Sequence, residues 1–299
     1  MAVTSLGSQS GDLGAPRRQP TRLQSLGRFL RTNPLALIGL IIFLAWVFIS
    51  IFAPYIAPHD PQAQNIVDRL QPPSSTYPFG TDQLGRDMLS RVMYGGRLSL
   101  PAGMMVIIVA GFIGILIGST AGYIGGWFEE MVMRLTEIFM AFPTIILAMA
   151  IAAALGPSLA NAIIAMVVVW WPNYARVVRS LVLTVKNADY VDAAHAIGVP
   201  RQRILRRTIL PNCLAPAVVL ATIDLGNAIL VFAGLSFLGL GPEPSTPEWG
   251  RMVADGIEYF DQWWISAFPG LAIFTVVIAF NFIGDGIRDA MDPRLRKSI

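Results

Sequence analysis

One polar stretch of this chain reads Tyr190-Val191-Asp192-Ala193-Ala194-His195-Ala196-Ile197-Gly198, and after a basic segment it continues as Thr208-Ile209-Leu210-Pro211. It lies between long apolar runs and predicts two short helices. We expect Asn187 to cap the first helix by accepting from its first backbone N–H groups, and Gly198 to end it in the left-handed conformation. Pro200 and Pro211 are expected to prevent one continuous helix, because proline lacks the N–H that an interior helical position needs.

The first of these helices is rich in small side chains, which would let the backbone of another protein approach closely. They are Ala188, Ala193, Ala194 and Ala196. The residues alone leave two interpretations open. The stretch is a docking element for another protein, or it is a loop held near the lipid surface by its arginines.

The composition is that of an integral membrane protein. Of 299 residues, 54% are hydrophobic and 14% are charged, and the mean hydropathy is +0.58, whereas a soluble domain carries about 25% charged residues. The single cysteine, Cys213, excludes an internal disulfide and a cysteine-based metal site. His59 and His195 lie far apart, which argues against a histidine-rich metal centre or a histidine-dependent catalytic triad. No nucleic-acid-binding signature occurs, and no metal site is expected.

Six apolar stretches are each long enough to cross a bilayer as a helix. Their approximate bounds are 34–57, 99–123, 131–155, 159–178, 213–240 and 267–284. The first is too long for the apolar part of a signal peptide, so we expect it to be retained. The second carries glycines at four-residue intervals, which predict a close packing seam within the chain or, alternatively, against another subunit. These glycines are Gly114, Gly118, Gly122 and Gly126.

The segments outside the spans are more polar. They are 1–20, expected to be a disordered cytoplasmic tail; 21–33, expected to be an amphipathic helix in the membrane interface; 58–97, a polar segment; 186–212, the loop quoted above; and 291–299, a second tail. The expected fold is therefore all-α. A core at 98–290 carries five of the spans, and one further span precedes it.

The distribution of lysine and arginine predicts the orientation of the chain. With six spans, both termini lie on the same side of the membrane as the loop at 186–212. That side carries Arg17, Arg18, Arg22, Arg28, Arg31, Arg176, Arg179, Lys186, Arg201, Arg203, Arg206, Arg207, Arg288, Arg294, Arg296 and Lys297, and the opposite side carries Arg69, Arg86, Arg91, Arg97 and Arg251. Because positive charge marks the cytoplasmic side, we expect both termini and the loop in the cytoplasm and 58–97 in the periplasm.

The polar loop resembles the EAA loop of ABC-importer permeases. In both, an acidic residue and two alanines are followed after three residues by glycine, and after nine more by a segment ending in Leu-Pro. Here Asp192 replaces the usual glutamate and Thr208 the usual isoleucine. In that family the loop forms a coupling helix that docks into a groove on the ATPase subunit. The resemblance implies this role for Asp192, Ala193, Ala194, His195, Gly198, Arg201, Leu210 and Pro211.

Further segments are similar to the C-type permease subunit of dipeptide, oligopeptide and nickel ABC importers. They are 31–36, 78–91 (with Phe-Gly-Thr-Asp-x-x-Gly-Arg-Asp-x-x-Ser-Arg from Phe79), 235–241, 247–250 and 284–293. From physics alone, 78–91 predicts a turn followed by an amphipathic helix capped at Thr81 or Asp82. The resemblance covers nearly the whole chain after residue 25. It implies a type I ABC importer permease fold with six transmembrane helices, in the inner membrane of a bacterium.

The resemblance also implies partners. They are a second, homologous permease subunit, two ATP-binding subunits, and a substrate-binding protein that is periplasmic or lipid-anchored. This chain contains no Gly-x-x-x-x-Gly-Lys-Ser/Thr phosphate loop, so we expect ATP and magnesium on the ATPase subunits. The chain itself is expected to have no catalytic residues and to bind no cofactor.

Polar residues inside the spans are candidates for a translocation pathway. The candidates are Asp224, Asn227, Asn281 and Trp171. Asp224 is the strongest, because a buried carboxylate without a partner costs several kcal/mol unless it faces protein or water. Glu137 can instead pair with Arg134, and the asparagines can form hydrogen bonds between helices.

The stretch 241–265, together with 58–97, is the expected docking surface for the binding protein. Acidic residues there offer charge complementarity. The candidates are Glu243, Glu248, Trp249 and Asp255, with Glu258 and Asp261 as further acidic groups.

The sequence argues against two other classes of function. Asp224 and Asp285 superficially suggest a two-aspartate intramembrane protease, but Asp285 is expected at the end of its span and Asp224 near the middle of its own. A secondary transporter would show internal repeats, and none is visible in the sequence. Dipeptides, oligopeptides, glutathione-like peptides and nickel chelates all remain possible substrates. A peptide is expected, because peptide transport is the commonest activity in the family.

Overall fold

The computed structural model describes residues 33–291, which are predominantly helical. The long helices are α2 (Pro34–Ile56), α3 (Met88–Ile124), α4 (Gly126–Met140), α5 (Thr144–Leu155), α6 (Leu159–Lys186), α9 (Leu210–Phe237) and α11 (Trp264–Met291). The short elements are η1 (Ile66–Asp68), α7 (Asp189–Ala196), α8 (Arg201–Ile204), the π-helical turn η2 (Leu205–Ile209) and α10 (Trp249–Asp255). Within 33–291 the extended pairing is limited to an isolated bridge between Thr81 and Asp87. The expected N-terminal tail, the expected C-terminal tail after Met291, and all but the last residue of the expected interfacial helix lie outside the described residues.

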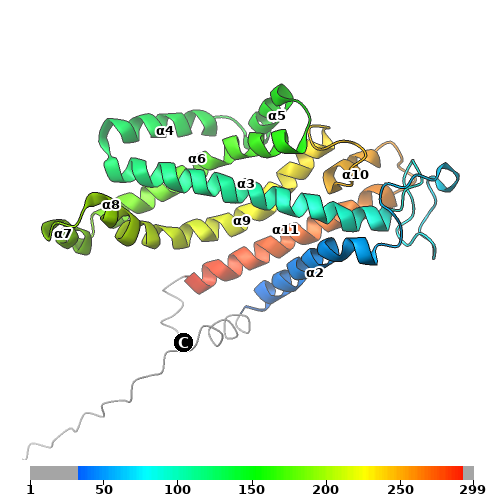
Figure 1. The fold of residues 1–299 in the computed structure, drawn as a ribbon, viewed down its shortest axis with the longest axis horizontal. Coiled ribbons are helices and arrows are strands. Elements are labelled where there is room, and N and C mark those ends of the chain that lie inside the picture. Colours follow the sequence, from blue (N-terminus) through cyan, green and yellow to red (C-terminus); the bar gives the residue numbers. More distant parts are fainter. Residues whose placement is uncertain (1–32, 292–299) are drawn as a thin grey trace, which may run out of the picture.

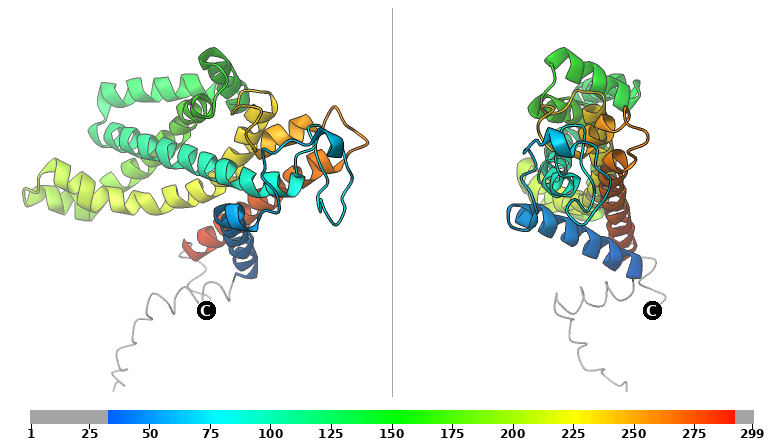
Figure 2. Two further views of the ribbon diagram at one scale, coloured as in Figure 1. Left: turned by 45° about the vertical axis from the view of Figure 1, so that its right-hand side comes forward. Right: turned by 90° about the vertical axis from the view of Figure 1, so that its right-hand side faces the viewer.

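The long helices run side by side along one axis of the molecule (Figure 1). α3, α6 and α9 form the middle of the bundle, α2 and α11 lie together on one side of it, and α4 and α5 lie on the other, as two further views show (Figure 2). One end, here named the α10 end, gathers α10 and the residues between α2 and α3. The opposite end, named the α7 end, carries α7 and α8.

Apolar side chains between α3, α6 and α9 form the main core. Val106 on α3, Met166 on α6 and Phe232 on α9 are each 0% exposed. α2 is attached to this body mainly through α11, where Trp46 Nε1 donates to Thr275 Oγ1 at 3.0 Å. The apolar outer face of α2 is left exposed, as expected for a helix that faces lipid.

The glycines of α3 form a packing seam with α6. A Cβ added at Gly114 or Gly118 would collide with the α6 backbone at Trp171 or Ala175. The seam within the chain is therefore confirmed, because only glycine lets the two backbones approach so closely. Gly126, the last of the expected series, begins α4 and has no such neighbour.

Within residues 33–291, four helical runs are long and apolar enough to cross a membrane. They are α2, α3, α11 and the continuous run of α8, η2 and α9. α4 and α5 pass the same test together, but they meet at 89°. The uninterrupted span expected at 131–155 is therefore wrong. The helix breaks at 141–143, where Pro143 adopts an extended conformation and caps α5.

α6 is not among the runs that pass this test, although it has 28 residues. Its second half carries Arg176, Arg179 and Lys186. It packs against α3, α4, α5 and α9, so much of its surface faces protein and need not be apolar. Six spans therefore stay a prediction, in which the bent pair is the third and α6 the fourth.

α3 begins earlier than expected. Its first residue is Met88, within the segment predicted to be polar, and Pro101 lies inside it. The N-cap is Asp87, whose carboxylate accepts from the Ser90 N–H at 2.9 Å. The predicted cap at Thr81 or Asp82 is therefore wrong, because both residues belong to the preceding loop.

The helix break expected at Pro211 is absent, whereas the break at Pro200 is confirmed. The helical run continues through η2, in which the Leu210 N–H donates to the Leu205 carbonyl. A π turn holds one more residue than an α turn, and this accommodates a proline that would otherwise clash with the preceding turn. α8, η2 and α9 consequently form one continuous helical rod, and Pro200 separates this rod from α7.

Candidate functional site

One face of α7 attaches it to the body of the protein. Val191 is fully buried in a cluster with Val182 of α6, Ile204 of α8 and Ile209 of η2. Burying an aliphatic side chain of this size stabilises by about 1.5–3 kcal/mol. These contacts therefore fix α7 against the stems of α6 and α9.

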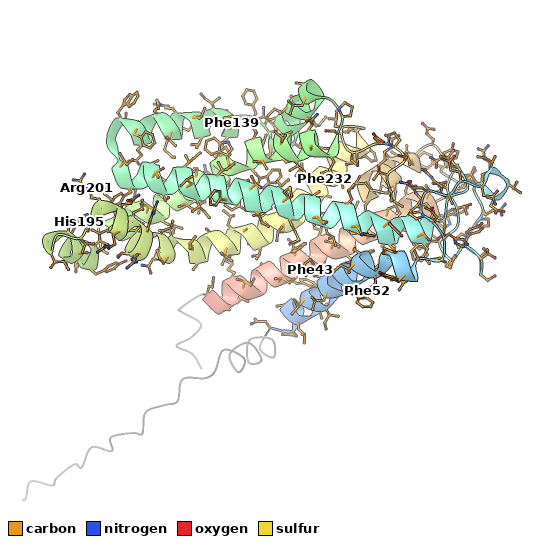
Figure 3. The ribbon with its side chains drawn as sticks, viewed as in Figure 1. Phe43, Phe52, Phe139, His195, Arg201 and Phe232 are labelled. Atoms are coloured by element: carbon orange, nitrogen blue, oxygen red, sulfur yellow. The ribbon has the colours of Figure 1, made fainter. Side chains whose placement is uncertain are left out.

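Most of the other side chains of α7, and the residue that ends it, are exposed. Tyr190 is 51% exposed and Ile197 is 80% exposed, and Asp192, Ala193 and His195 are exposed as well. Figure 3 shows His195 at this end of the molecule. Large apolar side chains at such exposure, beside small and charged ones, mark an interaction surface.

The other residues predicted for coupling lie nearby in different environments. Ala194 is half-buried, and Arg201 is exposed at the start of α8, also at this end (Figure 3). Leu210 is half-buried and Pro211 exposed at the start of α9. The predicted coupling residues from Asp192 to Arg201 therefore lie together at the α7 end, whereas Leu210 and Pro211 lie at the start of α9.

The ends of α7 differ from expectation at one point. Asn187 does not cap α7 but ends α6, and the N-cap of α7 is Ala188, which offers no side-chain cap. Asp189 and Asp192 lie in the first turn, where carboxylates interact favourably with the positive end of the helix dipole. Gly198 has φ +79°, so the left-handed ending predicted for it is confirmed.

Polar contacts connect the helices around α7. Lys186 Nζ, at the end of α6, donates to the Tyr123 carbonyl at the end of α3, at 2.8 Å. Arg179 of α6 pairs with Glu129 of α4, with Nε and Oε1 2.6 Å apart. α7 itself takes part through His195, whose Nε2 atom lies 3.4 Å from the Tyr123 hydroxyl.

A second candidate site is a pocket between α4, α5, α6 and α9, with a volume of about 330 Å³. It is lined by Phe139, Met140, Phe142, Thr144, Val169, Trp170, Asn173, Asp224 and Asn227. Asp224 is 8% exposed and faces the interior of the bundle. Its Oδ2 atom has no hydrogen-bond partner, and no ion pair to it forms within residues 33–291.

The bend between α4 and α5 shapes this pocket. Met140 ends α4, Thr144 begins α5, and Phe142 lies in the break between them. All three line the cavity over Asp224. A straight helix across 131–155 would not present residues from both sides of a bend to one pocket.

The other two residues predicted for the pathway do not line this pocket. Trp171 is buried in the core, with its ring 5.8 Å from the Phe139 ring in an edge-to-face arrangement. Asn281 lies on α11 beside Gly226 of α9, and Gly226 is on the opposite face of α9 from Asp224, since each helical residue turns by about 100°. Trp171 and Asn281 therefore lie outside this pocket, and a pathway role for these two residues stays a prediction.

Two further polar residues make local contacts, and for Glu137 this confirms the predicted pair with Arg134. Glu137 pairs with Arg134 at 3.1 Å, and both side chains are exposed. Asn161 Nδ2 donates to the carbonyls at the end of α5, at 2.8 and 2.9 Å. Both interactions are local and structural.

Two residues predicted to dock the binding protein are buried at the α10 end. Glu248 is 0% exposed and caps α10, accepting from the N–H groups of Gly250 and Arg251 at 3.0 and 2.9 Å. Burial raises the pKa of the Glu248 carboxyl, and these hydrogen bonds act in the opposite direction. Trp249 is 0% exposed and donates from Nε1 to a carbonyl of α3 at 2.9 Å. The docking role predicted for Glu248 and Trp249 is wrong, because both side chains are enclosed by their own chain.

The remaining acidic candidates differ in exposure. Asp255 has a side chain only 12% exposed, and it pairs with Arg251 at 3.1 Å. Burial raises the pKa of the Asp255 carboxyl, and the charge of Arg251 lowers it in part. Glu243, Glu258 and Asp261 are exposed and remain available to a partner.

The segment 78–91 encloses a buried charge cluster, defined here as Asp82, Arg86 and Arg91. Their side chains are 2%, 3% and 1% exposed. Asp82 Oδ2 lies 2.6 Å from Arg86 Nε and 3.5 Å from Arg91 Nε. Arg91 Nη1 also donates to the Pro61 carbonyl at 3.2 Å. The cluster joins the loop after α2 to the start of α3, so this segment is structural.

The sequence comparisons identify the family. Residues 114–297 match the family described as binding-protein-dependent transport system inner membrane component. Residues 21–73 match the family described as the N-terminal TM domain of oligopeptide transport permease C. The chain belongs to the binding-protein-dependent transport system inner membrane components.

Two relatives of this inner membrane component have been named for peptide transport. The dipeptide transport system permease protein DppC of Alkalihalophilus pseudofirmus is 45% identical over 268 residues, which cover 89% of this chain and 88% of the relative. The di/tripeptide transport system permease protein DppC of Pseudomonas aeruginosa is 43% identical over 286 residues, covering 93% and 94%.

The fold of this inner membrane component is shared with a solved transporter. The MetNI methionine ABC transporter, in an inward-facing conformation, matches with a TM-score of 0.52 at 22% identity, over 69% of this chain and 98% of that chain. The type I importer permease fold and the multi-pass inner-membrane location expected from the sequence are confirmed.

Two pocket residues of this inner membrane component, Trp170 and Asn173, were not predicted. They lie three residues apart on α6 and therefore share a helix face. Trp171, which was predicted, points about 100° away from that face. The sequence shows Trp170-Trp171-Pro172-Asn173, but which face of α6 lines a pocket depends on the helices that pack against α6.

Proposed function

We propose that this chain is the permease subunit of an ATP-driven importer and forms half of the translocation pathway for dipeptides and oligopeptides. The observation that carries the importer assignment is the projecting α7 unit, which is anchored by Val191 and otherwise exposed. The peptide assignment is supported by the relatives named for dipeptide and di/tripeptide transport.

In this proposal the α7 end docks on an ATPase subunit. The exposed Tyr190 and Ile197 would supply apolar contact area, and Ala193 would allow close approach. ATP and magnesium bind to the ATPase subunits. When ATP closes the ATPase dimer, α7 moves as a rigid unit and shifts the α8–α9 rod, which opens the pathway outward. Hydrolysis reverses the movement.

The assembly contains a second, homologous permease subunit, two ATP-binding subunits and a substrate-binding protein that is periplasmic or lipid-anchored. Both termini and the α7 end lie in the cytoplasm, because the lysines and arginines gather there. The binding protein docks on the α10 end. Its contacts involve the exposed Glu243, Glu258 and Asp261 rather than the buried acidic groups.

The test is uptake of a labelled dipeptide by cells that lack this chain, with and without the chain restored. A third strain restores the chain but carries an inactivated ATPase subunit. We expect uptake to return with the chain and to disappear with the inactive ATPase. Restored uptake that is indifferent to the ATPase would instead support an ATP-independent secondary transporter.

The same strains separate the substrate classes. If the chain restores uptake of nickel chelate or glutathione but of no dipeptide or oligopeptide, the importer assignment stands and the peptide assignment fails. Peptide uptake that is inhibited by neither nickel chelate nor glutathione supports the proposal as stated.

A further inference from the structure

Asp224 is a buried acidic group that forms no ion pair within residues 33–291. It lies on α9 within a span, at 8% exposure, and its Oδ2 atom accepts no hydrogen bond. The Tyr174 hydroxyl of α6 lies beside the carboxyl group but brings no compensating positive charge. A carboxylate in such a place is costly unless something compensates its charge. The remaining space beside it is the 330 Å³ pocket.

The chemistry of this pocket favours a small cation with hydrogen-bond donors. Asp224 is the sole charged residue among those that line it, and Asn173, Asn227 and Thr144 add uncharged polar groups. The other lining residues are apolar or aromatic, among them Phe139, which Figure 3 shows on α4. A few polar groups in a mainly apolar cavity of roughly 300–1,000 Å³ are typical of a small-molecule site.

We infer that the pocket at Asp224 is a subsite for the primary ammonium group of the transported peptide. This inference rests on the proposed function. The ammonium group donates to Asp224, the amides of Asn173 and Asn227 contact the first peptide unit, and the aromatic wall receives the first side chain. The bend between α4 and α5 is then a specificity device, because it closes the apolar side of the subsite over the carboxylate.

The test uses the whole complex, with the partner permease and both ATPase subunits, reconstituted in nanodiscs without the binding protein. The probe is labelled alanyl-alanine, and unlabelled alanyl-alanine and N-acetyl-alanyl-alanine are the competitors. We expect the first competitor to displace the probe and the acetylated one to fail. Asp224→Asn, which keeps the shape and removes the charge, should weaken binding by about tenfold or more, the scale of a lost hydrogen bond to a charged group. Asp224→Glu should recover most of it.

The matched control is Thr222→Ala, a change of a polar residue on α9 that lies outside the pocket and donates to a carbonyl of its own helix. It should leave binding of the probe unchanged. Complex yield and basal ATPase activity are recorded for each variant. If Asp224→Asn lowers the yield and Asp224→Glu restores it, the carboxylate belongs to a subunit contact and the inference is overturned.

Uptake by the same complexes with the binding protein present separates this inference from the proposed function. If the wild type transports alanyl-alanine but does not bind it in nanodiscs, or binds it equally after Asp224→Asn, the subsite is excluded and the importer stands. Equal competition by the acetylated peptide or by sodium or potassium ions also overturns the inference. No uptake of any peptide by the wild type rejects the proposed substrate itself.

Discussion

The two ends of this permease differ in the exposure of their side chains. At the α10 end, Asp82 and Arg91 are 2% and 1% exposed, and they pair with each other and with backbone groups of the chain. At the α7 end, Tyr190 and Ile197 are 51% and 80% exposed, and the charged side chains around them are exposed too. Both ends carry sequences that resemble the family. One such sequence is therefore buried inside the chain, while the other forms an exposed surface.

The difference has an energetic basis. Ions removed from water lose several kcal/mol of hydration, which is recovered only by good geometry and further hydrogen bonds. Asp82 achieves this through Arg86, Arg91 and the Leu84 and Arg86 N–H groups. α7 is held differently, mainly by the apolar contacts between Val191 and its neighbours. Changes at the α10 end should therefore damage stability, and changes at the α7 end should damage coupling.

The largest effect is expected from Asp82→Asn. It leaves Arg86 and Arg91 buried without their shared carboxylate, and removing one partner of a buried ion pair costs about 3–5 kcal/mol. We expect a strong fall in the thermal midpoint and the yield of the purified complex. Asp60→Asn, an exposed change in the same segment, is the control. An unchanged thermal midpoint for Asp82→Asn would show that the buried charge cluster does not stabilise the α10 end.

Trp249→Phe should have the next largest effect. It removes the hydrogen bond to the α3 carbonyl and leaves space where part of a fully buried ring stood, at a cost of about 1–3 kcal/mol. Trp263→Phe is the matched control, because Trp263 is 58% exposed and its replacement should change stability by at most about 0.5 kcal/mol. The thermal midpoints of the two variants should differ clearly; equal midpoints would contradict the enclosed role of Trp249.

Gly198→Val changes a residue at the α7 end and should affect coupling more than stability. A β-branched residue is strained at φ +79° by about 1–2 kcal/mol, although no atom lies within 4 Å of the added Cβ. We expect the complex to assemble with nearly normal yield and to lose most of its ATP-driven uptake. Gly270→Val, at a helical glycine that is also free of neighbours, should retain uptake. Normal uptake by Gly198→Val would argue against α7 as a rigid coupling unit.

The smallest effect is expected from Glu137→Ala. The Glu137–Arg134 pair is 64% and 82% exposed, and such surface pairs contribute about 0–1 kcal/mol. Stability and uptake should both stay within error of the wild type. A marked loss of uptake without a loss of stability would show that the coupling surface extends onto α4.

The features that the sequence predicted correctly are those set by local chemistry. Gly198 ends α7 because only glycine adopts that conformation without strain. Gly114 and Gly118 form a seam because their spacing places them on one helix face. Asp224 was expected to face the interior because the alternative, lipid, is too costly.

The features that the sequence did not predict depend on contacts between distant segments. Glu248 and Trp249 were taken for surface residues, and they are buried because α10 packs on α3 and α9. Pro211 was expected to break a helix, and the π turn at 205–209 absorbs it. The bend at 141–143 separates α4 from α5 although the apolar run is continuous.

The central claim is that the α7 end, and not the α10 end, docks on the ATPase. The most direct measurement is cross-linking of a single introduced cysteine to the ATPase subunits in the assembled transporter. Ile197→Cys is compared with Val67→Cys, since both positions are more than three-quarters exposed, at 80% and 86%. The native Cys213 is 1% exposed and contributes little background. We predict a cross-link from position 197 whose yield changes with ATP, and none from position 67. A cross-link from position 67, or none from position 197 in an active complex, would contradict the claim.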